Sequence, residues 1–380
     1  MSKIDVSTAL QPQLLAADGP VCLIVKATLS PIAGLDRFQP AGFPEIGQVI
    51  YDAPKQNGEV NATERVCIVD SPASMANHLE TVCLEGAGDL GLHSDLMGLP
   101  YVICVTDPAN GPISFDANDS NVRPVVSTFT EGHRLASDYF LDGKRIVNGD
   151  PEGRPFRDVL REGFKIVEVR KDKTYFITSD AWWDIFKIIF QYDPNSLVHG
   201  VMFAREQIKI SRVLTAHMEA LGARRVGRSG VKFDRLGKTT SGQPIFSVDD
   251  ETAHEIRATF ILDLALLRSF GRDNKGLSSN EKHLLLDLAL WKIVQLLRRP
   301  FRFRTQCHLR CDSVRFSTEE HDDFTMTLPK VNIASTIRAC DIRAESITRV
   351  YYPASELFKA GKETETANID DEEEAVEMEE

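Results

Sequence analysis

The chain has 380 residues, of which 42% are hydrophobic and 26% are charged, and its formal net charge is −12. This composition is that of an ordinary globular protein, and the length is sufficient to bury a full core. No apolar run approaches the ~20 residues that span a bilayer, and the N-terminus lacks an apolar signal segment, so we expect a soluble, cytoplasmic protein without a membrane partner. Seven scattered cysteines do not form a disulfide framework, and we interpret them as reduced core residues.

Charge is distributed unevenly along the chain. Residues 1–120 carry 5 Lys/Arg against 15 Asp/Glu, and residues 363–380 carry 10 acidic residues and no basic one. The section between them has 39 Lys/Arg against 31 Asp/Glu, a surplus of 8 positive charges. A basic middle section is compatible with polyanion binding on one face. The composition of the acidic tail, 363–380, predicts disorder.

Three strands are predicted in the first third of the chain. Val21–Leu29 is an apolar, β-rich run of the kind buried in the centre of a sheet. Ser30–Ile46 is rich in Pro and Gly and is predicted to be a loop, which carries Arg37. Arg65–Val69 and Tyr101–Val105 are the second and third predicted strands.

The second strand leads directly into a predicted helix. Ser71 is a natural N-cap, and Pro72 fits the first turn because its missing N–H has no partner there. Met75 and Leu79 begin an apolar stripe that faces a core. The hydroxyls of Ser71 and Ser74 and the free N–H groups of the first turn suit a phosphate, but the pattern alone favours the simpler interpretation that Ser71 caps the helix and Ser74 fills its first turn.

The middle of the chain combines loops with two predicted helices. Residues 107–163 are rich in Asp, Asn, Gly and Pro, and we interpret them as loops and short hairpins inserted in a scaffold. Phe164–Ile177 predicts a β-hairpin, because two β-rich arms flank a charged turn. Ala181–Tyr192 has helical spacing of aromatic and apolar residues, and Ser211–Leu221 is predicted to be a second helix that stops at Gly222.

The remaining segments are basic or strongly apolar. Ala223–Lys238 contains six basic residues separated by glycines. Ala258–Leu267 is apolar and fits a strand or a helix, whereas Ser278–Leu297 predicts a buried helix with a capping box formed by Ser278 and Glu281. Phe301–Phe316 alternates Phe with Arg, which predicts a strand with Phe on one face and Arg on the other. These Phe residues belong either to the core or to a surface on which bases stack.

Catalytic and metal-binding alternatives have weaker support. Cys307, His308 and Cys311 form one cluster, but the second ligand pair of a zinc site is missing. Ser71 and His78 can be placed in a hydrolase triad on paper, but a nucleophile elbow is absent from the sequence. We therefore expect no metal, no cofactor and no catalytic activity.

Five stretches of the sequence resemble the backbone subunit of type I-G (formerly I-U) CRISPR effector complexes, which belongs to the RAMP superfamily. They are RFQPAGFPEIG at Arg37–Gly47, VDSPASMANHLE at Val69–Glu80, HRLASDYF at His133–Phe140, SRVLTAHMEAL at Ser211–Leu221 and GVKFDRLG at Gly230–Gly237. The specific part is the pattern D-S-x-x-S-x-A-N-x-x-E together with the downstream H-R-L-A-S.

The resemblance implies an α+β fold, with a ferredoxin-like or RRM-like palm, inserted finger and thumb elements, and the shape of a right hand. Residues 1–362 would form this single domain, with insertions at approximately 107–163 and 223–250. The implied protein is non-catalytic and forms a helical filament of its own copies along the CRISPR RNA (crRNA), as the spine of a Cascade complex. The bases remain free to pair with target DNA, and the other partners are the large subunit and a repeat-processing (capping) subunit.

The resemblance and the basic segments together give a set of candidate contacts to the RNA backbone. These are Arg37, Ser71, Ser74, Asn77, Arg134, Arg212, Lys232, Arg235, Arg302 and Arg304. The sequence departs from the family pattern at His78, where an arginine is expected after the Asn, and in its acidic tail. Two alternatives remain open: a RAMP endoribonuclease that cleaves target RNA, and an unrelated α/β metabolic enzyme.

Overall fold

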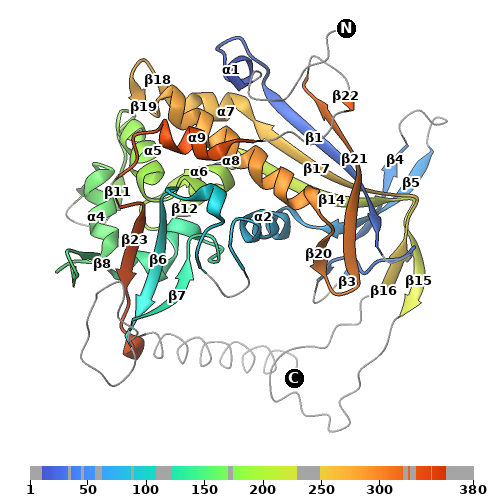
Figure 1. Ribbon diagram of the computed structural model, residues 1–380, viewed down its shortest axis with the longest axis horizontal. Helices are drawn as coiled ribbons and strands as arrows, with labels where there is room; N and C mark the ends of the chain where they lie inside the picture. The colour runs from blue at the N-terminus through green and yellow to red at the C-terminus, as the bar shows by residue number, and fades with distance from the viewer. Residues whose placement is uncertain are drawn as a thin grey trace.

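The computed structural model shown in Figure 1 describes residues 11–32, 36–43, 47–55, 62–86, 90–107, 122–169, 174–228, 249–319, 324–325, 331–343 and 345–356. These residues form an α+β molecule with a large antiparallel sheet and a smaller second sheet. In Figure 1 the large sheet occupies the right of the molecule, several helices cross the middle, and the smaller sheet lies at the lower left.

The large sheet has the strand order β20-β21-β1-β17-β14-β5-β4, and β22 pairs with β21. Every neighbouring pair in it is antiparallel. Its strands are β1 (Cys22–Pro31), β4 (Ile50–Pro54), β5 (Thr63–Asp70), β14 (Leu214–Leu221), β17 (Glu255–Asp263), β20 (Phe301–Arg304), β21 (Cys307–Ser317) and β22 (Phe324–Thr325). Alternate residues of β1 and β14 are buried, so one face of the sheet covers the core.

Six elements of this region follow the β-α-β-β-α-β order of a ferredoxin-like unit. They are β1, α2 (Pro72–Thr81), β14, β17, α8 (Ser279–Arg298) and β21. The four strands lie side by side as fourth, first, third and second, while β5 and β4 extend the sheet beyond β14. Helix α2 packs on β14, α8 packs on β21, and the two helices contact each other, so they cover the same face. This arrangement agrees with the α+β sheet predicted from the sequence.

The smaller sheet joins distant parts of the chain, in the order β7-β6-β23-β8-β9. Its strands are β6 (Tyr101–Thr106), β7 (Arg123–Ser127), β8 (Lys144–Val147), β9 (Asp150–Pro151) and β23 (Ile347–Tyr351). Strand β23 lies parallel to β6 and antiparallel to β8. The last described strand therefore completes a sheet that begins near residue 101.

The other described elements are short hairpins and helices. The hairpins are β2 (Gly42–Phe43) with β3 (Gly47–Gln48), β10 (Val167–Val169) with β11 (Thr174–Phe176), β12 (Val201–Phe203) with β13 (Ile208–Ile210), β15 (Arg224–Arg228) with β16 (Asp249–Thr252), and β18 (Gly271–Arg272) with β19 (Lys275–Gly276). The remaining α-helices are α1 (Gln11–Leu14), α3 (Asp138–Leu141), α4 (Phe156–Gly163), α5 (Ala181–Tyr192), α6 (Pro194–His199), α7 (Leu264–Ser269) and α9 (Ile333–Arg338). Two 3₁₀ turns are η1 (Ser94–Leu96) and η2 (Arg134–Ala136).

The predicted helix at Ser211–Leu221 is wrong, because Leu214–Leu221 forms β14, an interior strand of the large sheet. Leu214 and every second residue after it are buried, and the residues between them are partly exposed. The strand pairs with β17 on one side and with β5 on the other. Leu, Ala, Met and Glu favour helices, but burial between two strands overrides that intrinsic preference. Gly222 follows with φ of +64°, so it ends a strand rather than a helix.

Most other predicted elements are confirmed. The first three strands, the hairpin within Phe164–Ile177 and the helix Ala181–Tyr192 are present. The capping box of Ser278 and Glu281 is formed at the start of α8. Ala258–Leu267 contains both a strand end and a helix, since β17 runs directly into α7.

Two predictions about the connecting segments need correction. Phe301–Phe316 is not one strand but the hairpin β20–β21, because the chain turns at Thr305 and Gln306 and Gln306 adopts a φ of +56°. The insertion at 107–163 contains the helices α3 and α4 besides its strands. Residues 108–121 and 229–248, and the acidic tail, lie outside the described residues. Within the described part of the chain, no helix is both long and apolar enough to cross a membrane.

Candidate nucleic-acid interface

The junction between β5 and α2 presents a polar helix start at the surface. Ser71 has an extended backbone, and its Oγ accepts a hydrogen bond from the Ser74 N–H at 3.3 Å. Pro72 occupies the first turn, as predicted. Met75 is buried beneath the helix, whereas Asn77 is exposed and the two serines are half-buried. The first turn therefore offers hydroxyl and amide groups to the outside while its apolar face holds it in the core.

A buried carboxylate lies directly beneath this helix start. Asp70 is completely buried, and Arg304 donates a hydrogen bond of 2.9 Å to its Oδ1 and another to the carbonyl of Val69. The Nε2 of His78 lies 2.9 Å from the other carboxylate oxygen and 3.3 Å from the Ser74 Oγ. Arg304 therefore joins β20 to the end of β5 and fixes the start of α2, so its guanidinium is already engaged.

Aromatic packing accounts for the histidine that departs from the family pattern. The His78 ring meets Phe301 and Phe303 edge to face, at centroid distances of 5.4 and 5.2 Å. Phe303 is only 7% exposed, so it belongs to the core and not to a base-stacking surface. An imidazole fills the space between these two rings and the carboxylate of Asp70.

Arg134 of the H-R-L-A-S stretch is bound to the last residue of the α2 motif. Its Nε and Nη2 donate to the two carboxylate oxygens of Glu80 at 2.7 and 3.0 Å, and both side chains are buried. Its Nη1 donates to the carbonyls of Gly132 and Gly200. The two most specific motifs of the sequence thus meet in one buried, bidentate ion pair.

This ion pair continues into a buried polar network. Asn195 donates to a Glu80 oxygen at 2.6 Å and accepts a hydrogen bond from Lys292 of α8. Asp193 lies in the same interior and accepts a hydrogen bond of 2.6 Å from Ser196. Burial raises the pKa of Asp193 to about 7, and burial lowers the pKa of Lys292. The network ties α2, α6 and α8 together behind the surface.

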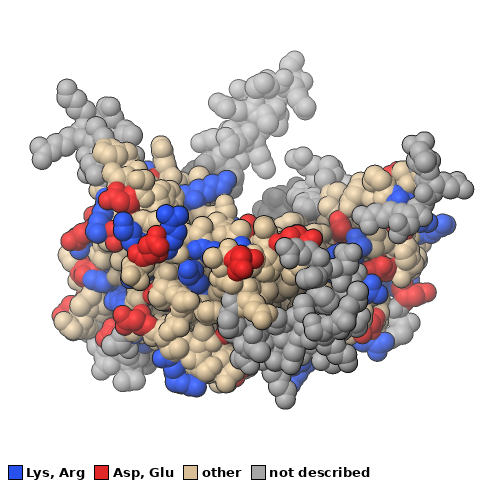
Figure 2. All heavy atoms as spheres, turned by 90° about the horizontal axis from the view of Figure 1, so that it is seen from above, with Lys and Arg blue, Asp and Glu red and all other residues tan. Residues whose placement is uncertain are grey.

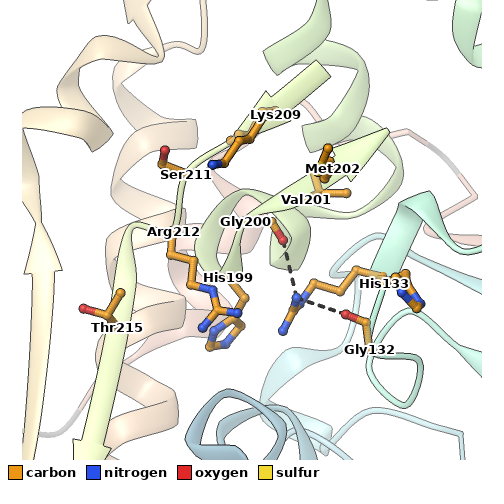
Figure 3. Close-up of a pocket in the computed structure, with 12 residues that line it drawn as sticks. Gly132, His133, His199, Gly200, Val201, Met202, Lys209, Ser211, Arg212 and Thr215 are labelled. Carbon is orange, nitrogen blue, oxygen red and sulfur yellow. Dashed lines mark hydrogen bonds between the residues drawn. The ribbon is translucent and has the colours of Figure 1, made fainter. Parts of the chain in front are cut away.

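A groove of about 550 Å³ opens beside the start of α2 (Figure 3). We call it the His199 groove; it is lined by Gly132–Arg134, His199–Met202, Lys209–Arg212 and Thr215. Arg212 reaches from this groove to the first turn of α2, where its Nη1 lies 3.4 Å from the Pro72 carbonyl oxygen. Among the described residues, no carboxylate lies within ion-pair distance of Arg212 or of the exposed Lys209. The groove thus holds two cations without a carboxylate partner in the described part of the chain, and one of them, Arg212, reaches the helix start.

The other predicted contacts are dispersed. Arg37 is 51% exposed and lies 3.6 Å from the Asp250 carboxylate. Arg302 is exposed and donates to the Thr305 hydroxyl. The structure brings Ser71, Ser74, Asn77 and Arg212 together, places Arg134 and Arg304 behind them, and leaves Arg37 and Arg302 apart from this group. Lys232 and Arg235 lie outside the described residues.

Neither positive nor negative side chains dominate the broad face of the molecule that is drawn in Figure 2. Figure 2 shows Lys and Arg side chains interspersed with Asp and Glu over the face seen from above in Figure 1. Local cations without a carboxylate partner therefore matter more than the net charge of the chain. Sequence reasoning missed Lys209 and His199, although Lys209 stands only three residues before Arg212: Lys209 lies within the short strand β13, and Arg212 follows the end of that strand.

Comparison with known proteins places these features in a family. A family model described as CRISPR-associated protein GSU0053 (Cas_GSU0053) matches residues 23–225, more than half of the chain. The chain belongs to this CRISPR-associated family. The matched region runs from β1 to β15 and includes α2, Arg134 and the His199 groove, so the site lies within the part that defines the family. A search of curated proteins finds no match.

Proposed function

We propose that this chain is a non-catalytic CRISPR RNA-binding subunit that oligomerises along the guide RNA as the spine of a type I-G Cascade complex for recognition of target DNA. The observation that carries this proposal is the start of α2 beside the His199 groove, which together offer hydroxyls, an amide and two cations that have no carboxylate partner among the described residues. The family membership supports a role in a CRISPR system.

The chemistry of this surface suits a sugar–phosphate backbone. Arg212 and Lys209 neutralise phosphates and release condensed counterions. The hydroxyl of Ser74 and the amide of Asn77 donate hydrogen bonds to phosphate or sugar oxygens, and the positive end of the α2 dipole favours an anion there. Contacts of this kind position the strand without reading its sequence, so the bases stay free to pair with target DNA.

Arg134 and Arg304 act in this proposal as positioning residues rather than as phosphate contacts. Arg134 already donates to Glu80 and two carbonyl groups, and Arg304 already donates to Asp70 and the Val69 carbonyl. They hold the motif rigid from behind, which lowers the entropy lost when RNA is ordered on it. Arg37, Arg302, Lys232 and Arg235 remain candidate contacts to further nucleotides.

The decisive experiment is co-expression of the chain with a CRISPR array, followed by purification. We expect short RNAs of uniform length to copurify, together with the large subunit and the repeat-processing subunit when these are supplied. For the purified chain, affinity for guide RNA should fall steeply with salt and depend little on base sequence. Absence of RNA binding at ~50 mM salt, or binding without salt dependence, would contradict the proposal.

Variants locate the binding surface. Arg212→Gln should weaken RNA binding and reduce the slope of affinity against salt by about 1, because one phosphate contact is removed. Arg272→Gln is the matched control, since Arg272 is an exposed arginine on the distant β18–β19 hairpin, with 82% of its side chain exposed. Equal losses in the two variants would point to non-specific attraction. Discrete cuts in target RNA with a divalent metal would favour the endoribonuclease alternative instead.

A further inference from the structure

His199 is a buried polar side chain without a partner. Only 1% of the residue is exposed, and neither ring nitrogen has a hydrogen-bond partner among the described residues. The residue ends α6 and lines the His199 groove, where Figure 3 shows its imidazole and the Arg212 guanidinium both reaching towards the middle. Buried polar groups in native proteins are almost always satisfied, so an unpartnered ring at a groove indicates a missing ligand group.

The surroundings of His199 define the kind of group that fits. Burial, reinforced by the nearby Lys292, Arg134 and Arg212, lowers the pKa of His199 well below its usual value. The ring is therefore neutral at physiological pH, with one N–H donor and one acceptor nitrogen. A phosphate offers only acceptors, so it can pair with the protonated ring nitrogen but not with the acceptor nitrogen. A hydroxyl group both donates and accepts, so it can satisfy either nitrogen in either tautomer.

The rest of the groove supplies the features that flank such a hydroxyl in a polynucleotide. Arg212 and Lys209 stand at its rim, and the wall between them contains Ile210 and Val201, which are apolar. Gly200 adopts a φ of +79°, and a Cβ there would lie 2.9 Å from the Ile210 carbonyl oxygen and 3.0 Å from the Arg212 Cγ. Because Gly200 has no side chain, the groove wall can lie close to Arg212. This close packing holds the Arg212 side chain beside His199.

We propose that the His199 groove holds one ribonucleotide of the bound strand, with Arg212 and Lys209 on its phosphates and the His199 ring on the ribose 2′-hydroxyl. This inference rests on the proposed function and adds a specificity: the protein distinguishes RNA from DNA at this position. The 2′-hydroxyl is the group by which proteins make that distinction, and it is absent from a DNA strand of the same sequence.

The test compares an RNA strand with a DNA strand of the same sequence on the purified full-length protein at one salt concentration. We expect the wild type to bind RNA more tightly than DNA. His199→Phe should lower RNA affinity by about three- to tenfold and leave DNA affinity unchanged, because one neutral hydrogen bond is lost. His199→Asn should restore part of the preference, since an amide retains a donor and an acceptor.

Lys209→Gln is the matched control, because Lys209 lies on the rim of the same groove and contacts phosphate in the proposal. This variant should bind RNA and DNA more weakly by the same factor, so the ratio of the two affinities should stay unchanged. Each variant is checked by its melting temperature. A folded His199→Phe protein that keeps the full preference for RNA, or a wild type without any preference, overturns the inference and leaves the proposed function standing. A wild type that binds neither strand overturns the proposed function itself.

The wild-type protein decides the question if the His199 variants fail to fold. RNA strands that carry 2′-deoxy or 2′-O-methyl groups are then titrated against the unmodified strand. Loss of affinity on both modifications supports the inference, because the first removes the hydroxyl and the second blocks its proton and adds bulk. Equal affinity for all three strands overturns it.

Discussion

At the scale of single residues, the most specific sequence motifs serve the interior as much as the surface. Glu80 ends one motif and Arg134 is the second residue of the other, and their ion pair is buried. Asp70 begins the first motif, and it too is buried, beside Arg304 and His78. The acids of the motif therefore hold the helix from behind, while Ser74 and Asn77 between them face outward.

Glu80→Gln should destabilise the fold by about 3–5 kcal/mol, because it leaves the buried Arg134 guanidinium without a counter-charge. Urea unfolding followed by circular dichroism measures the change. The control is Glu162→Gln, which breaks the exposed pair of Arg154 and Glu162 at 2.7 Å and should cost less than about 1 kcal/mol. Comparable losses of stability in the two variants would mean that the buried ion pair stabilises the fold no more than the exposed pair does.

Asp193 should make the stability of the fold depend on pH. The pKa of Asp193 is raised to about 7, mainly by burial and also by the neighbouring Glu80, while Ser196, Lys292 and Thr128 act in the opposite direction. Because the folded-state pKa lies above the unfolded value of about 4, the folded state binds the extra proton. The contribution is therefore complete below pH 4 and is lost as the pH rises through about 7.

Asp193→Asn should remove this dependence, since an amide stays neutral and its oxygen still accepts the hydrogen bond from Ser196. As the pH rises from 4 to 8, we expect the free energy of unfolding of the variant to increase by roughly 2–4 kcal/mol relative to that of the wild type. Urea unfolding at several pH values measures the difference. Parallel stability curves for the two proteins over that range would refute the assignment.

At the scale of elements, the joint between α6 and β12 determines the geometry of the His199 groove. The helix ends at His199, the chain turns at Gly200, and β12 leaves towards the hairpin that returns with Arg212. The turn requires a positive φ, and the Ile210 carbonyl and the Arg212 side chain leave no room for a Cβ. A single backbone position thus sets the distance between the histidine and the arginine.

Gly200→Ala should therefore cost about 1–3 kcal/mol in stability and also weaken RNA binding, because Arg212 must shift. Gly149→Ala is the matched control: Gly149 also has a positive φ, of +87°, but a Cβ there would meet nothing within 4 Å. The control variant should lose stability only through backbone strain, and its affinity for RNA should be unchanged. Thermal melts and RNA titrations on both variants separate the two effects. An unchanged RNA affinity in Gly200→Ala would show that Arg212 does not depend on this turn.

Local signals in the sequence predicted the elements whose ends they control. Ser71 with Pro72 marked the start of α2, and Ser278 with Glu281 marked the start of α8, because a cap acts on residues three or four positions away. Strand β14 was missed because its helix-forming composition is local, whereas its two partner strands are distant in sequence. The His199 groove was missed for the same reason: burial and the lack of a partner are properties of the packed molecule, and no short pattern encodes them.

At the scale of the whole molecule, both sheets depend on residues that follow late in the chain. Strand β23 lies between β6 and β8 in the smaller sheet, and it supplies the only parallel pairing recorded among the described strands. The segment 101–151 therefore lacks its central strand until Ile347–Tyr351 is present. This dependence makes truncation informative.

Removal of residues 345–380 should lower the melting temperature sharply and expose an unpaired edge on β6, which favours aggregation. Removal of residues 363–380 alone should leave the melting temperature unchanged, because β23 is retained. Expression yield and differential scanning calorimetry on the two truncated chains provide the comparison. Equal behaviour of the two truncations would show that the smaller sheet does not need β23.

The position of β1 has a consequence for synthesis on the ribosome. Both neighbours of this strand, β17 and β21, lie after residue 254, so the first strand to be made is among the last to be paired. At about 5–20 residues per second, roughly 10–45 seconds pass between the emergence of β1 and that of its nearer partner. Throughout that interval this ten-residue strand, with its buried face of Leu23, Val25, Ala27 and Leu29, has no native strand to pair with, and nascent-chain holding factors would protect it.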